Sequence, residues 1–281
     1  IRDAVDEGVV EKLVKLRGSE EALIKTYVEE YDVMPEPARE LLEGMVARMI
    51  AKIAARIAER GKRRSLKVRE PYEPGDEELD EEETIERFLG KEVPEPEDLV
   101  SIKRVPKKLA VVLLLDVSNS MQREKMLAAS LAVGALAHKL ERDYYSVIAF
   151  KDDAKVIKGL VERKEIVELI REILSIETGG ATDIRKALEK AWEELERADI
   201  REPLDEKVAV LVSDGWHTRG RDPREAAGLF RKLHVIQVGI GGGTESSVTL
   251  SKELARIGRG KYVFIDDYSE LPYKLVDILR S

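Results

Sequence analysis

Apolar and polar positions follow two different patterns along the chain, and the change between them falls near residue 107. From residue 35 to residue 61 the apolar positions recur at steps of three and four, which is the spacing of one helix face. Pro35 and Pro37 suit the start of this helix, and Gly61 suits its end. A weaker helical pattern, broken near Gly18, covers residues 3–31. The first part of the chain is therefore predicted to be helical.

After residue 107, continuously apolar runs such as "LAVVLLL" and "VAVLVS" alternate with amphipathic segments. Continuous apolar runs are typical of strands buried on both faces, and strand–helix alternation predicts a doubly wound, mainly parallel α/β sheet. "KDDAKVIKG" follows "YSVIAF" after a short polar turn, which predicts one short antiparallel edge strand. The expected strands cover residues 109–115, 145–150, 208–213, 234–239 and 261–265, and the helices cover about 123–141, 162–174, 183–197, 223–232, 246–257 and 269–279.

A charged segment lies between these two patterns. Basic "KRRSLKVR" is followed by acidic, proline-containing "EPYEPGDEELDEEET" and "VPEPEDL". This composition favours extended or loop structure with at most one short helix near residues 84–89. The predicted organisation is a helical N-terminal region at 1–64, a charged linker or packing segment at 65–106, and an α/β domain at 107–281.

The amino-acid composition limits the kinds of metal site and of binding partner that the protein can have. The chain has no Cys and three His, so thiolate zinc sites are excluded and an imidazole-rich metal site is disfavoured, whereas an oxygen-ligated cation stays open. No apolar run approaches the roughly 20 residues that span a bilayer, and "IRDAVDEGVV" lacks the features of a signal peptide. A net charge of −8 argues against a general nucleic-acid binder. With 37% charged residues, we expect a cytoplasmic protein of thermophilic type.

Oxygen-bearing side chains follow the first apolar strand in "VVLLLDVSNSM". Ligands of open parallel sheets bind beyond the carboxyl ends of the strands, where Asp116 is expected to lie. Ser118 and Ser120 follow at alternate positions, so all three side chains can face one point. Carboxylate and hydroxyl oxygens suit hard cations such as Mg²⁺ or Mn²⁺.

Two later loops carry further oxygen donors. "ETGGATDI" places Thr182 before a helix, where Gly179 and Gly180 allow a sharp bend, and "VLVSDGWHT" places Asp214 at another strand end. Each of these residues taken alone is equally well explained as a helix cap. Their joint occurrence in three loops favours a metal site with two carboxylates and three hydroxyls: Asp116, Ser118, Ser120, Thr182 and Asp214.

These three motifs, D-x-S-x-S, G-G-x-T-x-[IL] and S-D-G in this order, resemble the metal-ion-dependent adhesion site (MIDAS) of von Willebrand factor A (VWA, integrin I-like) domains. All five positions match, and the resemblance covers roughly residues 105–281. It implies a VWA/Rossmann-like fold, a bound Mg²⁺ (with Mn²⁺ or Ca²⁺ as alternatives), and a protein partner whose Asp or Glu completes the metal shell. It implies binding, not catalysis.

A narrower resemblance concerns the lead-in "REPYEPGDEELDEEETIERFLGK" and "DLVSIKRVPKKLAVVLLLDVSNSM". It is similar to magnesium-chelatase D-type and other stand-alone VWA proteins, which implies a MoxR-type AAA+ ATPase, or its substrate, as partner. The chain lacks Walker-loop glycines and is not expected to be an ATPase. The alternatives are an RNA-binding VWA protein, disfavoured by the acidic charge, and a Mg²⁺-dependent hydrolase, disfavoured because Ser118 stands where such a site needs a second Asp.

Two neighbours of these motifs could be mistaken for site residues. Asp183, beside Thr182, is predicted to cap its own helix. His217, near Asp214, could act as a base, but no nucleophile accompanies it, so we expect a loop residue at the rim of the site.

Overall fold

A six-stranded sheet forms the centre of the α/β domain in the computed structural model, which describes residues 19–59, 65–89, 91, 93, 95–118, 123–197, 200, 203–239 and 244–279. The strand order is β5-β4-β3-β6-β7-β8, and every neighbouring pair is parallel except β4 with β5. This confirms the predicted doubly wound sheet with one antiparallel edge strand. The strands are β3 (Leu109–Asp116), β4 (Tyr144–Phe150), β5 (Ala154–Lys158), β6 (Glu206–Ser213), β7 (Leu233–Val238) and β8 (Arg259–Ile265).

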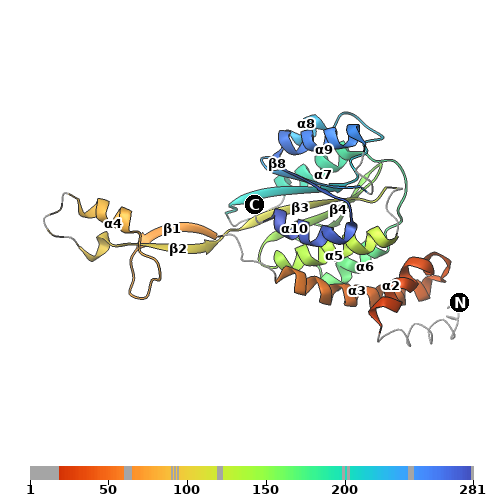
Figure 1. Ribbon diagram of the computed structural model, residues 1–281, viewed down its shortest axis with the longest axis horizontal. Coiled ribbons are helices and arrows are strands. Elements are labelled where there is room, and N and C mark those ends of the chain that lie inside the picture. Colours follow the sequence, from red (N-terminus) through yellow and green to blue (C-terminus); the bar gives the residue numbers. More distant parts are fainter. Residues whose placement is uncertain are drawn as a thin grey trace. The chain divides into compact units, whose positions relative to one another are not determined.

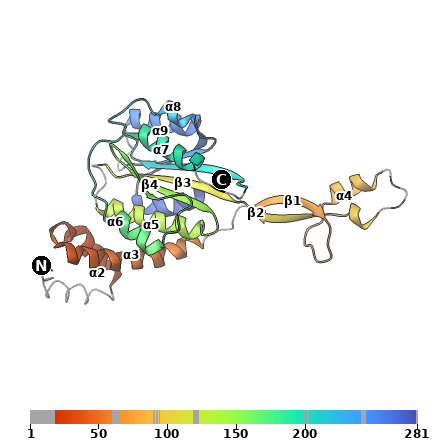
Figure 2. The same cartoon turned by 180° about the vertical axis from the view of Figure 1, so that it is seen from behind.

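Helices cover both faces of this sheet (Figure 1), and the same layers are seen from behind (Figure 2). Alternate residues of β3 enter two separate cores, because successive side chains of a strand point to opposite faces. One face carries α5 (Arg123–Lys139), α6 (Ile166–Leu174) and α10 (Leu271–Ile278); the other carries α7 (Ile184–Arg197), α8 (Arg224–Ala227) and α9 (Glu245–Ile257). The helix predicted at 223–232 is shorter than expected, since α8 ends before Gly228.

The N-terminal helices pack on the outside of α5 and α6 and belong to the same compact unit as the α/β domain. They are α2 (Glu20–Glu29), the short 3₁₀ helix η2 (Tyr31–Val33) and α3 (Glu36–Ala58). A Cβ atom on Gly134 of α5 would lie 2.9 Å from Ala54 Cβ, so this glycine permits the close approach of α3. The predicted helical pattern of residues 3–18 lies outside the described residues.

Arg123, the first residue of α5, is held by the N-terminal helices. Its guanidinium pairs with Asp32 at 2.5 Å and lies 4.1 Å from the centroid of the Tyr31 ring. A cation over an aromatic face combined with an ion pair fixes the start of α5 in two directions. The N-terminal region therefore supports the helix that follows the D-x-S-x-S loop.

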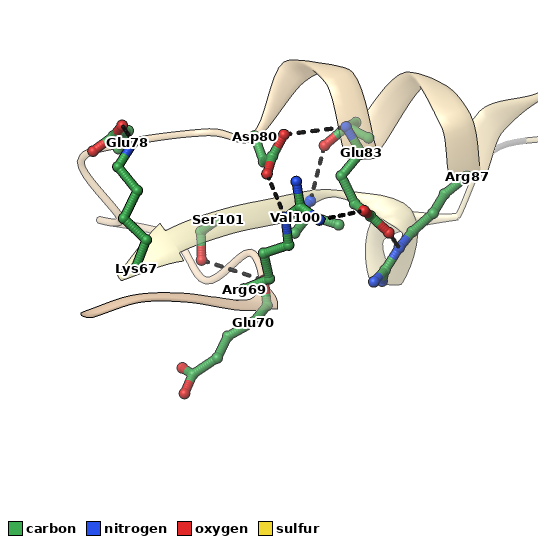
Figure 3. Close-up of polar contacts among 10 residues, drawn as sticks. Lys67, Arg69, Glu70, Glu78, Asp80, Glu83, Arg87, Val100 and Ser101 are labelled. Carbon is green, nitrogen blue, oxygen red and sulfur yellow. Dashed lines mark hydrogen bonds and ion pairs between the residues drawn. The ribbon is translucent and has the colours of Figure 1, made fainter. Parts of the chain in front are cut away.

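Residues 61–108 form a second compact unit. It contains β1 (Ser65–Pro71) paired antiparallel with β2 (Val100–Pro106), the helix α4 (Glu81–Phe88) and the short η3 (Pro96–Asp98). The helix was predicted near this position, but the strand pair was not. Arg69 on β1 bridges Asp80, the N-cap of α4, and Glu83 in its first turn, at 2.8 and 3.1 Å (Figure 3). Ion pairs and caps thus hold α4 against the strands.

Lys158 on the edge strand β5 is a buried cation, only 3% exposed. Its ammonium donates to the carbonyls of Tyr145 at 2.6 Å and Gly159 at 3.1 Å, and lies 3.8 Å from the Tyr145 ring centroid. Burial, opposed in part by Glu162, lowers the pKa of Lys158 to about 8. Its charged form is therefore less favourable in the folded chain than in the unfolded chain.

This burial predicts a rise of stability with pH. Between pH 8 and the ordinary lysine pKa of 10.5, the unfolded chain binds the proton that the folded chain has released, so the free energy of unfolding should rise by up to about 3 kcal/mol. Urea unfolding across this window should show the rise, and Lys158→Met should remove it. An equal slope in both proteins would contradict the prediction.

Candidate metal site at the carboxyl edge of the sheet

Asp116 ends β3, and its side chain is 3% exposed. Both carboxylate oxygens accept hydrogen bonds: Oδ1 from the backbone N–H of Ser118 at 3.0 Å, and Oδ2 from the Ser213 hydroxyl at 2.7 Å. The next residue, Val117, continues the ladder by donating to the Phe150 carbonyl. The carboxylate is thus fixed at the strand end by its own loop and by the neighbouring strand β6.

The D-x-S-x-S loop is described as far as Ser118, which is buried and lies against the Asp116 carboxylate. Ser120, the predicted fifth ligand, lies outside the described residues, so the structure does not place it. The loop leads into α5, whose start is held at Arg123 as described above.

The Gly-rich loop is tied to the Asp116 loop through its backbone. Gly179 and Gly180 both have positive φ, 140° and 86°, which gives the sharp bend expected from their sequence. The Gly179 N–H donates to the Val117 carbonyl at 3.1 Å. Thr182 follows and is 3% exposed as a residue, and among the described contacts its hydroxyl makes no hydrogen bond. A hydroxyl without a hydrogen bond has oxygen lone pairs left for a ligand.

The S-D-G loop after β6 is hydrogen-bonded to the loop that carries Thr182. Thr182 donates its N–H to the Thr218 hydroxyl at 2.9 Å and accepts the Thr218 N–H at 3.0 Å. Asp214 is partly buried, and its Oδ1 accepts the Trp216 N–H at 3.1 Å. The three loops that carry Asp116, Thr182 and Asp214 are therefore joined to one another at this edge of the sheet.

Asp183 and His217 stabilise the start of α7. Asp183 Oδ1 accepts the Lys186 N–H at 3.1 Å, so the cap predicted from the sequence is confirmed. His217 Nδ1 accepts the Ile184 N–H at 3.2 Å, and Nε2 lies 2.9 Å from the Arg221 carbonyl. This pair of contacts requires the tautomer with the proton on Nε2. Both ring nitrogens are thus engaged in loop structure, as expected for a rim residue.

The site carries uncompensated negative charge. Burial raises the pKa of Asp116 to about 6, opposed by the hydrogen bonds from Ser213 and Ser118 and increased by the charge of Asp214. Burial and the charges of Asp214 and Asp116 likewise raise the pKa of Tyr268, on the short 3₁₀ helix η4 (Tyr268–Glu270). In the described part of the chain, no Lys or Arg forms an ion pair with Asp116 or Asp214. A buried carboxylate without a cationic side chain favours a bound cation.

The donor set fits a hard cation. Asp116, Ser118, Thr182 and Asp214 supply carboxylate and hydroxyl oxygens from adjoining loops, and these are ligand types that Mg²⁺ and Mn²⁺ accept. No three His, Asp or Glu side chains of the described residues form a metal cluster. A metal here would take hydroxyl, backbone-carbonyl or water oxygens beside the two carboxylates, and ligation by these residues stays a prediction.

Ser213 lies in the S-D-G motif but was assigned no role from the sequence, and Thr218 was not singled out. Ser213 Oγ donates to Asp116 and accepts the Gly215 N–H at 3.0 Å, so it links two of the predicted ligand loops. The register of the sheet explains the contact between Ser213 and Asp116, because Leu115 of β3 pairs with Val212 of β6 and the next residues of the two strands then lie side by side. That register needs the strand order, which local sequence does not contain.

The fold and the residues of the candidate site point to one family of α/β proteins, and a comparison with known families finds the same one. The profile of the von Willebrand factor type A domain matches residues 110–277, and the chain belongs to this family. The match begins in β3 and ends in α10, so it leaves out the N-terminal helices and the 61–108 unit.

Among curated proteins, the chain is similar to the magnesium-chelatase 67 kDa subunit of Chlorobaculum parvum, with 31% identity over 135 residues. That match covers 46% of this chain and 21% of the relative. It is also similar to the uncharacterized protein YfbK of Escherichia coli K12, with 23% identity over 61% of this chain and 31% of that protein. The chain thus spans less than a third of either relative.

Solved structures share the fold. Proximal thread matrix protein 1 from the mussel byssus, solved with a zinc-occupied MIDAS motif, has a TM-score of 0.51 and 19% identity, covering 62% of this chain and 47% of that one. An aerotolerance-related membrane protein from Bacteroides fragilis has a TM-score of 0.50 and 20% identity, covering 61% and 98%. Within the described residues of the present chain, no helix has the length and apolar character needed to cross a bilayer.

Proposed function

We propose that this protein is a metal-dependent protein–protein interaction module. The observation that carries the proposal is the buried Asp116 carboxylate, which has no cationic side chain as partner among the described residues and lies where three loops meet. A divalent cation would neutralise Asp116 and Asp214 together. The zinc-occupied MIDAS of the mussel protein supports a divalent ion at the equivalent place in this fold.

We assign the metal to Asp116, Ser118, Ser120, Thr182 and Asp214, with Mg²⁺ as the physiological ion and Mn²⁺ or Ca²⁺ as substitutes. When bound, the ion supplies a positive charge that a partner's Asp or Glu can join. The chain's own residues hold that place: Ser213 orients Asp116, and Thr218 holds the backbone of Thr182. A shell with only two carboxylates leaves coordination positions to water, and a partner's carboxylate oxygen could replace one of these waters.

Binding without catalysis is the activity that these contacts favour. A hydrolase would need a base or nucleophile free to act beside the metal. His217 lies in the loop that follows Asp214, and both of its nitrogens are used to hold α7 and the 217–221 loop. We therefore propose no enzymatic activity.

We further propose a cytoplasmic adaptor that works with a MoxR- or chelatase-type AAA+ ATPase, binding the ATPase or its substrate through the metal. The similarity to the magnesium-chelatase 67 kDa subunit supports this choice of partner class.

Two measurements test the proposal. Isothermal titration with Mg²⁺ and Mn²⁺ should give one saturable site per chain. A pull-down from lysate of the source organism, with Mg²⁺ or with EDTA and followed by mass spectrometry, should retain an AAA+ ATPase only with Mg²⁺. Titration without binding of either ion would refute the metal site; metal binding with the same captured proteins in both buffers would refute the metal bridge.

Ser213→Ala should weaken divalent binding by about tenfold, because residues that orient a metal ligand typically contribute 10- to 100-fold in affinity. The change removes the 2.7 Å hydrogen bond to Asp116 and leaves the ligand itself in place. Ser213→Thr keeps a hydroxyl and should recover most of the affinity. If Ser213→Ala bound Mn²⁺ as tightly as the wild type, Ser213 would have no role in orienting Asp116.

A further inference from the structure

The helix α4 carries an exposed apolar stripe. Ile85 and Leu89 are four residues apart and 57% and 73% exposed, and Val93 beyond them is 75% exposed. Residues at this spacing lie on one side of a helix. By helical periodicity this side lies opposite Glu83, which with Asp80 pairs with Arg69 on β1 (Figure 3). Thr84 accepts the Val100 N–H and also holds α4 to the strands.

Carboxylates border this stripe. Glu81, Glu82 and Glu86 lie on the same side of α4 by helical periodicity, and none of the three forms an ion pair within the described residues. By contrast, Glu83 on the opposite side is paired with both Arg69 and Arg87. The stripe therefore combines apolar side chains with free negative charge.

The 61–108 unit gains little stability from an apolar core of its own. Among its described residues Val100 is the one buried apolar side chain, and the other buried side chains are polar: Asp80, Thr84, Asp98 and Ser101. Large apolar side chains that are exposed together mark a candidate interaction site. The unit is built to hold α4 in position through ion pairs while its apolar stripe stays available.

The other compact unit offers a complementary surface. A groove of about 1040 Å³ lies between α2, α3 and the residues around the start of α6. Its apolar lining includes the partly exposed Ala51, Ala55, Ile166 and Val167, together with Met45 and Met49, which are only 6% and 7% exposed. The groove is thus suited to receive an apolar helix face.

The rim of this groove is basic. Arg48, Lys52, Lys164 and Arg163 line it together with His138, against two carboxylates, Glu20 and Glu165. Arg48, Lys52 and Arg163 form no ion pair within the described part of the chain. Free cations around an apolar groove match free carboxylates around an apolar stripe.

We propose that α4 of one chain docks into the groove of a second copy of this chain, with Ile85 and Leu89 against Ile166 and Val167 and the carboxylates of α4 beside Arg48 and Lys52. Because two different surfaces meet, the contact is heterologous, and repetition of it gives a ring or an open chain of copies, not an isolated pair. The contact uses none of the predicted metal ligands, so it is independent of the proposed metal function.

Sedimentation velocity of the full chain in EDTA tests this proposal. The wild type should associate beyond a dimer with rising concentration, and added salt should weaken the association because exposed charges are screened. Ile85→Glu with Leu89→Glu should weaken it by at least about tenfold, since the pair removes two apolar contacts and adds two charges. Leu229→Glu, at an exposed apolar position on another surface, should leave it unchanged.

Charge-reversal variants distinguish the contact between α4 and the groove from other modes of self-association. Glu82→Lys with Glu86→Lys in one chain, and Arg48→Glu with Lys52→Glu in another, should each weaken self-association. A mixture of the two variants should associate again through the reversed pairs. All four positions are exposed, so the fold should survive, as circular dichroism would verify. A monomeric wild type, or a mixture that does not recover, would overturn the proposal.

Discussion

Asp116→Ala is expected to lower the affinity for Mn²⁺ and Mg²⁺ by on the order of 100-fold or more and to abolish metal-dependent capture of the partner. Asp116 is the more deeply buried of the two predicted carboxylate ligands, and it accepts hydrogen bonds from both the D-x-S-x-S loop and β6. The fold should persist, because the side chain ends a strand at the sheet edge and contributes no apolar packing. Isothermal titration and circular dichroism measure the two effects separately.

Asp153→Ala is the matched control for this experiment. Asp153 lies in the loop between β4 and β5, is exposed, and makes a 3.8 Å ion pair with Lys186. Removal of this surface charge should change metal affinity by less than about twofold, since exposed pairs contribute little. Equal affinity of Asp116→Ala and the wild type for Mn²⁺ would disprove the proposed ligand set.

Gly215→Ala should destabilise the chain by about 3 kcal/mol and weaken metal binding as well. Gly215 has φ of 84°, where alanine is strained, and an added Cβ would lie 2.7 Å from Ser251 Oγ, 2.8 Å from Gln237 Nε2 and 2.9 Å from the Ser247 carbonyl. Gln237 donates from that nitrogen to the Asp214 carbonyl at 2.9 Å, so relief of the clash should displace Asp214. Urea unfolding and Mn²⁺ titration report the two effects.

Gly75→Ala is the control that measures the cost of backbone strain without the steric clash expected at Gly215. Gly75 also has positive φ, 113°, but an added Cβ would meet no atom within 4 Å. It should therefore cost only the strain of the left-handed backbone, about 1 kcal/mol, and leave metal affinity unchanged. If Gly215→Ala were no more destabilising than Gly75→Ala, the close contacts beneath Asp214 would not matter.

The prediction of the α/β sheet rested on a strong local signal. Strands buried on both faces must be apolar at every position, and "LAVVLLL" has that property, so β3 and its neighbours could be located within one or two residues. The antiparallel edge strand β5 followed from the very short connection after β4, which leaves no room for a crossover helix.

The strand pair of the 61–108 unit could not be predicted from the local sequence pattern. The strands β1 and β2 are stabilised by charged cross-strand neighbours such as Lys103 with Glu70 at 3.1 Å, and most of their side chains are exposed. The apolar alternation in these strands is limited to Leu66 with Val68 and Val100 with Ile102, which is too short a pattern to predict a strand pair. Without knowledge of the strand pairing, the charged composition of this segment is the one expected of a solvated linker.

Local sequence was enough to predict the class of fold, the strand ends and the order of the oxygen-bearing motifs, because burial and turn chemistry are encoded within a few neighbouring residues. Three features became known from the folded chain alone: Ser213 donates to Asp116, Arg123 is held by Asp32 and Tyr31, and α4 presents free carboxylates beside Ile85 and Leu89. Each of these features joins residues brought together by sheet register or helix packing. Such distances depend on how whole elements pack, which no short stretch of sequence specifies.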